Sequence, residues 1–407
     1  MRLDPSKHAW MTAPETRKLM AALGEGRFVG GAVRNALSGW AVSDIDIAVP
    51  MPPTETMQRL ERAAIKAVPT GFEHGTVTAI VGGQPFEVTS LRRDVQTDGR
   101  HAVVTYTDDW EEDSSRRDFT MNALYASAGG EIFDYHDGVA DLIAGRVRFV
   151  GDAAARIRED YLRILRLFRF HAWYGKGEMD VDALRAAADA KAGLAQLSGE
   201  RIAKELLRLL ECSNPVPALR MMAASGILSE LLPYALRLPR LEQLVGIEAD
   251  NQFPPDALLR LAALLPDDAD AARKVAERLK LSNAERARLE ALALPGDKIA
   301  PQSSAAEVRR LLYRIGSPRF RDLVLLSWAA GSRGPAMHWR MLLSIADGWE
   351  RPRFPLTGHE AMAAGVAEGP EVGRLLGLVE AWWLDENFAP DHAQLMEKLK
   401  SLIGTAS

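Results

Sequence analysis

Alternating apolar and polar positions predict β-strands only in the first third of the chain. Such alternation, or short β-branched runs bounded by turn residues, occurs at 27–29, 44–49, 76–81, 86–91 and 131–134. Apolar positions at helical spacing lie between these runs and predict helices at 12–23, 32–37, 54–68 and 120–126. The chain up to about Val150 is therefore expected to form a mixed α/β unit with a small sheet.

The polar stretch 92–118 interrupts this pattern. It has no helical period and only one β-like patch, at 103–107, so we predict a mobile loop that is anchored at its end by residues 116–119. Beyond about Gly151 the strand-like patterns almost disappear, and helix-length pieces rich in Ala, Leu, Arg and Glu alternate with breaks that contain Pro or Gly. This part is expected to be all-helical, which makes the protein an α+β fold.

The segment from Arg27 to Val49 carries the first candidate chemistry. A short strand is followed by two glycines, a helix and a second strand that carries Asp44 and Asp46. Residues two apart in a strand point to the same face, so the two carboxylates are expected to lie side by side. Such a pair is costly unless a cation lies between its members, and oxygen-only ligands suit Mg²⁺. Solvated acids on an outer strand face are the alternative.

Glu87 is a candidate third carboxylate. In the run 86–91 it alternates with Phe86 and Val88, so it lies on the opposite face of a neighbouring strand from these apolar residues. A site that holds two cations about 4 Å apart needs bridging and flanking acids. The alternative for Glu87 is a plain solvent-facing strand residue.

The segment 155–172 predicts one long amphipathic helix. Asp160 and Arg163 are three residues apart and share a face, which Arg166 and Arg169 continue, and Glu159 is placed to hold Arg163 by an i,i+4 ion pair. The stripe expected to face the core consists of Ile157, Tyr161, Ile164, Leu165 and Phe168.

A carboxylate fixed beside a guanidinium can imitate the pairing edge of a base. Asp160 would accept a hydrogen bond from an exocyclic amino group, and Arg163 would donate to a ring nitrogen or carbonyl. Cytosine and adenine carry that amino group, whereas uracil and guanine present a carbonyl that would leave acceptors unpaired. The pair could thus select CTP and ATP without a nucleic-acid template. A surface ion-pair ladder is the alternative.

Composition and charge narrow the class of protein further. A length of 407 residues suggests two to four domains, and the apolar and charged contents, 47% and 26%, are those of an ordinary globular protein. A single cysteine, no signal-like start and no apolar run of membrane-spanning length predict a cytoplasmic protein. The net charge of −5 does not favour a general nucleic-acid binder, but seven arginines between 146 and 169 allow a local basic surface.

In their order along the chain, these motifs resemble those of the class II tRNA nucleotidyltransferases, the CCA-adding enzymes that are related to bacterial poly(A) polymerase. GGAVRN with DID resembles the first motif of that family, RRDFTMNAL the second and REDYLRILR the fourth. The matching segments, from the first motif to the fifth, are 30–46, 116–124, 137–152, 158–166 and 197–210.

The resemblance implies an architecture and an activity. It implies a polymerase β-like nucleotidyltransferase head at 1–150, a neck with the base-recognition helix at 151–232, a helical body at 233–345 and a tRNA-binding tail at 346–407. The activity would be template-independent addition of C and A to the 3′ end of tRNA from CTP and ATP. The tRNA would be held by its acceptor half, and neither a membrane nor an obligate protein partner is expected.

The resemblance also implies roles for individual residues. Asp44 and Asp46, with Glu87 beside them, would be the catalytic residues and would hold Mg²⁺. The first motif would bind the triphosphate, the second the ribose, and the fourth would act as a protein template for C and A. The residues expected to bind the nucleotide are Gly30, Gly31, Arg34, Arg117, Asp118, Asn122, Glu159, Asp160, Arg163 and Arg166.

Two departures and three rival functions remain at this point. Asn35 and Ser38 stand where the family usually has Asp and Leu, so no role is carried onto either. A poly(A) polymerase is the first rival, but a polymerase acting on any RNA should be more basic than this chain. A-only and CC-only transferases keep all five motifs and stay open. A catalytically idle RNA-binding protein has no reason to keep the strained carboxylate pair.

Overall fold

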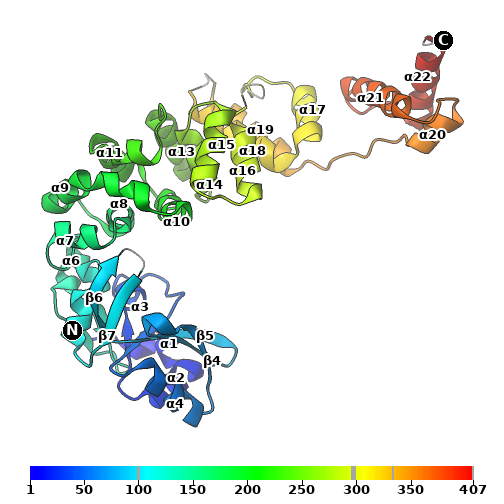
Figure 1. The fold of residues 1–407 in the computed structure, drawn as a ribbon. Coiled ribbons are helices and arrows are strands. Elements are labelled where there is room, and N and C mark those ends of the chain that lie inside the picture. The colour runs from blue at the N-terminus through cyan, green and yellow to red at the C-terminus, as the bar shows by residue number, and fades with distance from the viewer. Residues whose placement is uncertain (99–100, 295–298, 332–333, 406–407) are drawn as a thin grey trace. The chain divides into compact units, whose positions relative to one another are not determined.

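The computed structural model describes residues 1–98, 101–294, 299–331 and 334–405 (Figure 1). The chain divides into two compact units, Met1–Tyr234 with Glu277–Leu281, and Ala235–Ala276 with Ser282–Ser407. The first unit contains the sheet and a set of helices, whereas the second is helical, so the predicted α+β class is confirmed. The finer division into head, neck, body and tail stays a prediction.

A single mixed sheet organises the first unit. Among the described residues it has seven strands in the order β3-β4-β5-β2-β1-β8-β9, and β2 and β5 are its parallel pair. The β4–β5 hairpin turns at Gly82 and Gly83, both at positive φ. The strands are β1 (Arg27–Val29), β2 (Asp46–Val49), β3 (Lys66–Gly71), β4 (Thr76–Val81), β5 (Gln84–Ser90), β8 (Leu124–Ala126) and β9 (Ile132–Asp134).

Short helices cover this sheet. Helices α2 and α4 contact each other and β4, and they bury Leu19, Leu23 and Leu60 completely (Figure 1). The α-helices of this region are α1 (Ala9–Thr12), α2 (Pro14–Leu23), α3 (Gly31–Leu37), α4 (Pro53–Arg62), α5 (Trp110–Ser115) and α6 (Gly138–Ala144). The 3-10 helices are η1 (Pro5–Lys7), η2 (Phe72–His74) and η3 (Thr120–Asn122).

Three helix predictions for this region were wrong in part. The helix predicted at 12–23 is α2, which begins only at Pro14 because the chain is extended at Ala13, and Thr12 belongs to the separate short helix α1. The helix predicted at 54–68 ends at Arg62, because Ala64 has a left-handed φ of 52°, and Val68 lies in strand β3. The helix predicted at 120–126 is a single 3-10 turn followed by strand β8, all of it buried, and a segment that is buried on every side carries no period to distinguish helix from strand.

The loop prediction for 92–118 was also wrong. Strands β6 (Arg92–Asp98) and β7 (His101–Tyr106) form a separate two-stranded sheet, and α5 follows (Figure 1). Asp109 caps α5 by accepting hydrogen bonds from the amides of Glu111 and Glu112. The hairpin is joined by main-chain hydrogen bonds, which need no apolar alternation, so a polar sequence conceals it.

Helices α7 and α8 replace the one long helix predicted at 155–172. Asp160 between them is extended, with φ −154° and ψ 107°, and its carboxylate accepts the amide of Leu162. Helix α8 packs against α10, and α7 packs against α9. The helices here are α7 (Ala153–Glu159), α8 (Leu162–Tyr174), α9 (Val181–Asp189), η4 (Lys191–Gln196), α10 (Gly199–Leu210), α11 (Val216–Ala224) and α12 (Ile227–Leu231).

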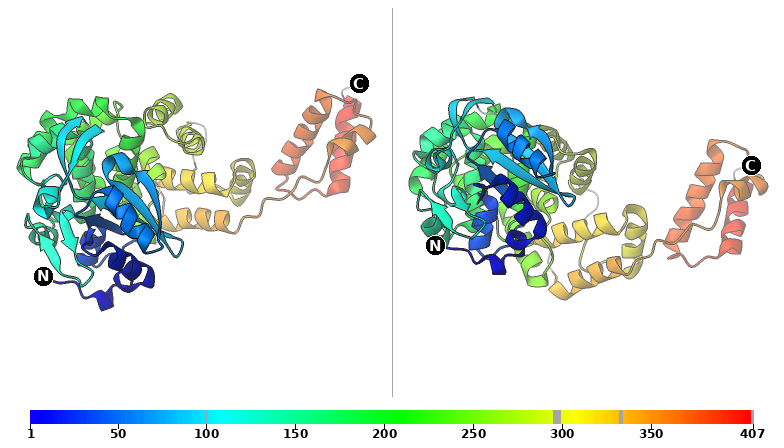
Figure 2. Two further views of the ribbon diagram at one scale, coloured as in Figure 1. Left: turned by 60° about the horizontal axis from the view of Figure 1, so that its bottom comes forward. Right: turned by 90° about the horizontal axis from the view of Figure 1, so that it is seen from below.

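In the second unit, every regular element of the described residues is a helix (Figure 2). Helix α13 packs against α14 and α18, and α20, α21 and α22 enclose a further apolar cluster around Val379 and Trp383. No described helix is long and apolar enough to cross a membrane. The helices from α13 on are Leu238–Asn251, Ala257–Leu264, Ala269–Arg278, Asn283–Leu292, Ala305–Ile315, Ser317–Ala329, Ala336–Asp347, Gly358–Ala363, Pro370–Asp385 and His392–Thr405.

Candidate active site

The two glycines after β1 form a tight turn that is flanked by arginines. Gly30 has φ 65° and ψ −118°, a conformation that side-chain-bearing residues avoid, whereas Gly31 is the first residue of α3. A Cβ placed on Gly30 would lie 3.8 Å from a guanidinium nitrogen of Arg117, and one placed on Gly31 would lie 3.7 Å from Arg34. The turn therefore brings a main chain without side chains close to two fixed positive charges, with Gly30 buried and Gly31 partly exposed.

Arg34 is buried and firmly held. Its Nη1 donates to Oδ1 of Asn122 at 2.5 Å and its Nη2 to Oδ1 of Asn35 at 2.9 Å. Its guanidinium carbon lies 4.4 Å from the ring centre of Tyr174. Burial lowers the pKa of Arg34, but an arginine remains charged at any physiological pH.

Asp46 opens strand β2 and lies next to Glu87. The two are register partners in the parallel β2–β5 pair, Asp46 half-buried and Glu87 exposed. Asp44 is exposed and precedes the strand, so the prediction that both aspartates lie within one strand was wrong; β2 begins only at Asp46. Burial raises the pKa of Asp46, and the charges of Glu87 and Asp44 raise it further.

These three carboxylates have the oxygen-only chemistry of a Mg²⁺ site, but their side chains do not form a closed ligand set. In the described residues no group of three His, Cys, Asp or Glu side chains is arranged to hold a metal ion. Burial is the main cause of the raised pKa of Asp46, and the negative charges of Glu87 and Asp44 add to it while Arg117 opposes it. A cation bound at this place would relieve that charge, so the donor set fits a divalent metal.

Asp113 on α5 is a buried hub that the sequence reasoning missed. Its carboxylate binds Arg116 at 2.7 Å, Arg117 at 3.0 Å and the hydroxyl of Tyr125 at 2.7 Å. Burial alone would raise the pKa of Asp113, but Arg117 and Arg116 outweigh it and lower the pKa to about 2. The i+3 and i+4 spacing from Asp113 to the two arginines indicates this cluster only if the segment is helical. The loop predicted for 92–118 therefore concealed it.

Asp118 connects the second motif to helix α8. One oxygen accepts two hydrogen bonds from Arg166, at 2.8 and 2.5 Å, and the other accepts from the amide of Phe119 and from Asn122. Burial raises the pKa of Asp118, but Arg166 and Asn122 outweigh it and lower the pKa to about 2. Because the four lone-pair positions are filled, a ribose hydroxyl could donate to Asp118 only if one bond opened.

Glu159, Asp160 and Arg163 lie at the break between α7 and α8. Arg163 donates to Glu159 at 2.6 Å, the predicted i,i+4 pair, and reaches the main-chain oxygen of Arg116 at 3.3 Å. Asp160 was expected to share a helix face with Arg163; it lies outside the helix instead and is bound by Arg201 of α10 at 2.6 Å.

Arg201 and Glu205 are further residues that the sequence reasoning did not single out. Glu205 is buried on α10 and binds Arg169 at 2.5 Å and Arg166 at 3.5 Å. The segment 197–210 was expected only to support the fourth motif in general. Its Arg and Glu at i and i+4 on an apolar-striped helix were the available signal for specific partners.

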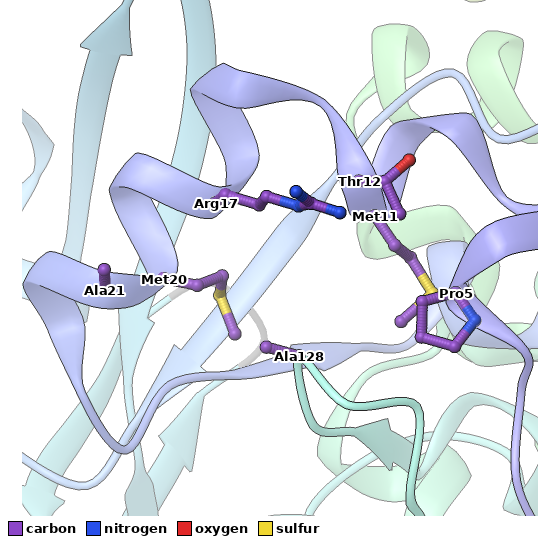
Figure 3. A pocket seen from close by; sticks show the side chains of 7 residues that line it. All are labelled: Pro5, Met11, Thr12, Arg17, Met20, Ala21 and Ala128. Carbon is purple, nitrogen blue, oxygen red and sulfur yellow. The ribbon is translucent and has the colours of Figure 1, made fainter.

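A separate cavity of about 310 Å³ lies elsewhere in the first unit (Figure 3). The methionines Met11 and Met20 and the guanidinium of Arg17 point into it from α1 and α2. None of the candidate site residues lines it. Its largely apolar wall lacks the acids and phosphate-binding turn that nucleotidyl transfer needs.

Known families match two parts of the chain, and residues 149–177, which contain Glu159, Asp160, Arg163 and Arg166, lie between the two matches. Residues 26–148 match the Poly A polymerase head domain, and residues 178–237 match the probable RNA and SrmB-binding site of polymerase A. The head match spans the glycine turn, the three carboxylates and the Asp113 cluster.

Whole-length relatives agree with these matches. The mitochondrial CCA tRNA nucleotidyltransferase 1 of Mus musculus is 35% identical over 92% of this chain and 86% of its own length. The CCA-adding enzyme of Latilactobacillus sakei is 30% identical over 90% of this chain and 91% of its own. The structure of the Bacillus stearothermophilus CCA-adding enzyme in complex with CTP superposes with a TM-score of 0.76 at 25% identity, covering 97% of this chain and 98% of that one. The chain therefore belongs to the family of CCA-adding tRNA nucleotidyltransferases and their poly(A) polymerase relatives, as its motifs predicted.

Proposed function

We propose that this protein adds C and A nucleotides to the 3′ end of tRNA from CTP and ATP and releases pyrophosphate. The carrying observation is that the candidate base-reading and sugar-reading residues are directly bonded. Arg163 reaches the main chain of Arg116, and Arg166 holds Asp118, so the second and fourth motifs form one site. Relatives that match 90% and 92% of this chain are named for CCA addition or as CCA tRNA nucleotidyltransferases, which supports these substrates.

The glycine turn and its arginines hold the triphosphate in this proposal. Gly30 is buried and Gly31 partly exposed, neither carries a side chain that would keep a phosphate away, and Arg34 and Arg117 place positive charge beside them. Because Arg34 is already fixed by Asn122 and Asn35, little conformational freedom is lost when a phosphate binds. Arg117 is likewise held by Asp113, which orients it toward the turn.

Metal ions are used by nucleotidyltransferases of this family, and we propose Mg²⁺ here, held by Asp44, Asp46 and Glu87. When bound, the metal supplies positive charge that favours ionisation of the RNA 3′-hydroxyl and offsets charge on the leaving pyrophosphate. Asp46 is the central ligand, because it is the half-buried member whose charge the other two acids oppose. Glu87 is fixed beside it by the β2–β5 register.

Asp160 and Arg163 select the base in this proposal. Each oxygen of Asp160 already accepts one hydrogen bond, from Arg201 and from Leu162, but a carboxylate oxygen can accept another. The exocyclic amino group of cytosine or adenine would provide it. Uracil would place a carbonyl against the carboxylate, a repulsive contact that binding cannot offset.

Two further predictions stay part of the proposal. The helical tail is expected to hold the tRNA acceptor half by shape and backbone contacts, and the cytoplasm remains the predicted compartment. Neither changes the chemistry at the carboxylates.

The direct test is incorporation into defined tRNA. The protein is incubated with Mg²⁺, tRNA lacking its last three nucleotides, and each nucleoside triphosphate singly and in mixture. Products longer by two with CTP and by three with CTP and ATP support CCA addition. Stops that need only one of these nucleotides indicate a CC-only or A-only enzyme, a ladder of A indicates a poly(A) polymerase, and no product indicates an idle RNA-binding protein. A variant with Asp44→Ala and Asp46→Ala is the matched control.

A further inference from the structure

An exposed tryptophan lies between the glycine-turn helix and the catalytic strand. Trp40 is 41% exposed and occupies the turn that joins α3 to β2, four residues before Asp44. Its ring stacks on Tyr174 at the end of α8, with ring centres 4.8 Å apart and planes 27° apart. The edge of Trp173 supports it, with ring centres 5.8 Å apart.

Asn35 fixes the position of this aromatic group relative to the triphosphate residues. Its Oδ1 accepts from the hydroxyl of Tyr174 at 3.0 Å and from Arg34 at 2.9 Å. Its Nδ2 donates to the oxygen of Ala41 at 3.2 Å, and its main-chain oxygen accepts the amide of Trp40 at 2.9 Å. The turn that carries Trp40 is thus bound by both the main chain and the side chain of Asn35, and the same side chain also holds Arg34.

We propose that Trp40 is a stacking platform for one of the last two bases of the RNA acceptor, an inference that rests on the proposed function. The acceptor 3′ end must reach Asp44 and Asp46, and the segment 40–44 runs directly from the indole to these acids. Unpaired RNA bases are commonly bound by stacking on aromatic side chains. Trp40 leaves two-fifths of its surface exposed, so part of the indole is available for a further contact beyond the stack on Tyr174.

The incoming nucleotide is not the partner of Trp40. Its base is assigned to Asp160 and Arg163 at the start of α8, whereas Tyr174 ends that helix. Arg163 and Tyr174 are separated by 11 residues, about 16 Å along a helix axis, so one base cannot contact both ends. The base on Trp40 must therefore belong to the other substrate.

A coupling experiment tests this platform. Binding of a fluorescein-labelled acceptor-arm RNA to the full-length protein is measured by anisotropy, without nucleotide, for wild type, Trp40→Leu and Trp40→Phe. We expect Trp40→Leu to weaken binding about tenfold, because Leu keeps an apolar volume but lacks a π face, and Trp40→Phe to weaken it only about two- to threefold. With an RNA whose last two nucleotides are abasic, wild type and Trp40→Leu should bind equally.

Two results would overturn the platform. One is equal binding of intact RNA by wild type and Trp40→Leu; the other is the same Leu penalty on the abasic RNA, which would show that Trp40 only supports the fold. Thermal unfolding of both variants is measured in parallel: loss of the stack on Tyr174 should lower the melting temperature of Trp40→Leu, but both variants should remain folded at the assay temperature. The proposed function is judged separately by nucleotide incorporation in the wild type, so either idea can fail without the other.

Discussion

Asp160 and Arg201 form an ion pair of 2.6 Å that connects the break between α7 and α8 to helix α10. Sequence spacing predicted that Arg163 would be the neighbour of Asp160, but Arg163 is bound by Glu159 instead. The acceptor and the donor of the base-reading pair are therefore held by two different partners. Selection of the base should consequently depend on α10 as well as on the motif that touches the base.

Replacement of Arg201 tests this dependence. In Arg201→Gln the carboxylate of Asp160 loses its only ion-pair partner among the described contacts and can leave the position that reads an amino group. We expect the ratio of kcat/KM for CTP over UTP to fall about tenfold, which corresponds to about 1.4 kcal/mol of lost discrimination. Single-nucleotide incorporation with each triphosphate measures it.

The control for Arg201→Gln lies on the same helix. Arg208 pairs with Glu211 at the surface, and its side chain is 63% exposed, so Arg208→Gln should leave the CTP to UTP ratio unchanged. A loss of activity with both nucleotides at an unchanged ratio in Arg201→Gln would show that the ion pair supports the fold and does not set selectivity.

Asp113 should be the most costly single acid to replace in the first unit. Asp113→Asn leaves Arg116 and Arg117 facing a neutral amide in a buried place, and removal of one partner from such a pair costs about 3–5 kcal/mol. The midpoint of urea unfolding measures this loss. Glu111→Gln, an exposed change on the same helix, should stay within about 0.5 kcal/mol of wild type. Equal urea midpoints for Asp113→Asn and Glu111→Gln would contradict the structural role of Asp113.

Acid should weaken the same region over a defined pH window. The arginines that bind Asp113 and Asp118 lower the pKa of each carboxyl group from its ordinary value of 3.8 to about 2. A carboxyl group with a lowered pKa in the folded state stabilises the fold above its unfolded value, and this stability is lost as pH falls from about 4 toward 2. Thermal unfolding between pH 5 and 2 measures the loss, and Asp113→Asn should flatten the curve.

The strands and helices that the sequence predicted well are those with one buried and one exposed face. In β5, Phe86 and Val88 are buried and Glu87 is exposed, and the alternation was readable. The prediction for strand β8 was wrong because Leu124, Tyr125 and Ala126 are all fully buried and show no alternation. The prediction for the β6–β7 hairpin was wrong because its sequence is polar.

The site was predictable in its residues but not in its contacts. The i,i+4 spacing correctly predicted the ion pair between Glu159 and Arg163, which lie one helical turn apart. Spacing could not predict the ion pair between Asp160 and Arg201, because these residues are 41 positions apart in the chain. It also missed the helix break at Asp160, because Asp160 is compatible with a helix and only its bond to Leu162 marks the new start.

Gly30 and Gly31 allow a matched test of the phosphate turn. Gly30→Ala forces a side chain into φ 65° and ψ −118°, a strain of about 1–3 kcal/mol, whereas Gly31→Ala lies in ordinary helical geometry with its nearest contact at 3.7 Å. Only Gly30→Ala should lower the unfolding midpoint. Both should raise the KM for CTP, because each adds a methyl group where a phosphate would approach the main chain. An unchanged KM in Gly31→Ala would remove Gly31 from the triphosphate site.

Asp46 should be needed for catalysis although its ionised carboxylate lowers the stability of the folded protein. Its pKa is raised by burial and by Glu87 and Asp44, so the folded protein holds the proton more tightly than the unfolded chain. The stability of a group with a raised acid pKa is complete below 3.8 and is lost as pH rises through the folded value.

Asp46→Asn should therefore stabilise the metal-free protein at pH 7 by about 1 kcal/mol, while it lowers nucleotide incorporation about 10³-fold or more. Added Mg²⁺ should raise the melting temperature of wild type but not of the variant, since binding to the folded state alone stabilises it. The gap in melting temperature between the two metal-free proteins should shrink as pH approaches 4, because wild-type Asp46 then becomes protonated. Glu61→Gln on α4, an exposed acid outside the site, is the control and should change none of these measurements. A variant less stable than wild type at pH 7 without metal would show that Asp46 is a structural acid, and the assignment of the metal site would then rest on Asp44 and Glu87 alone.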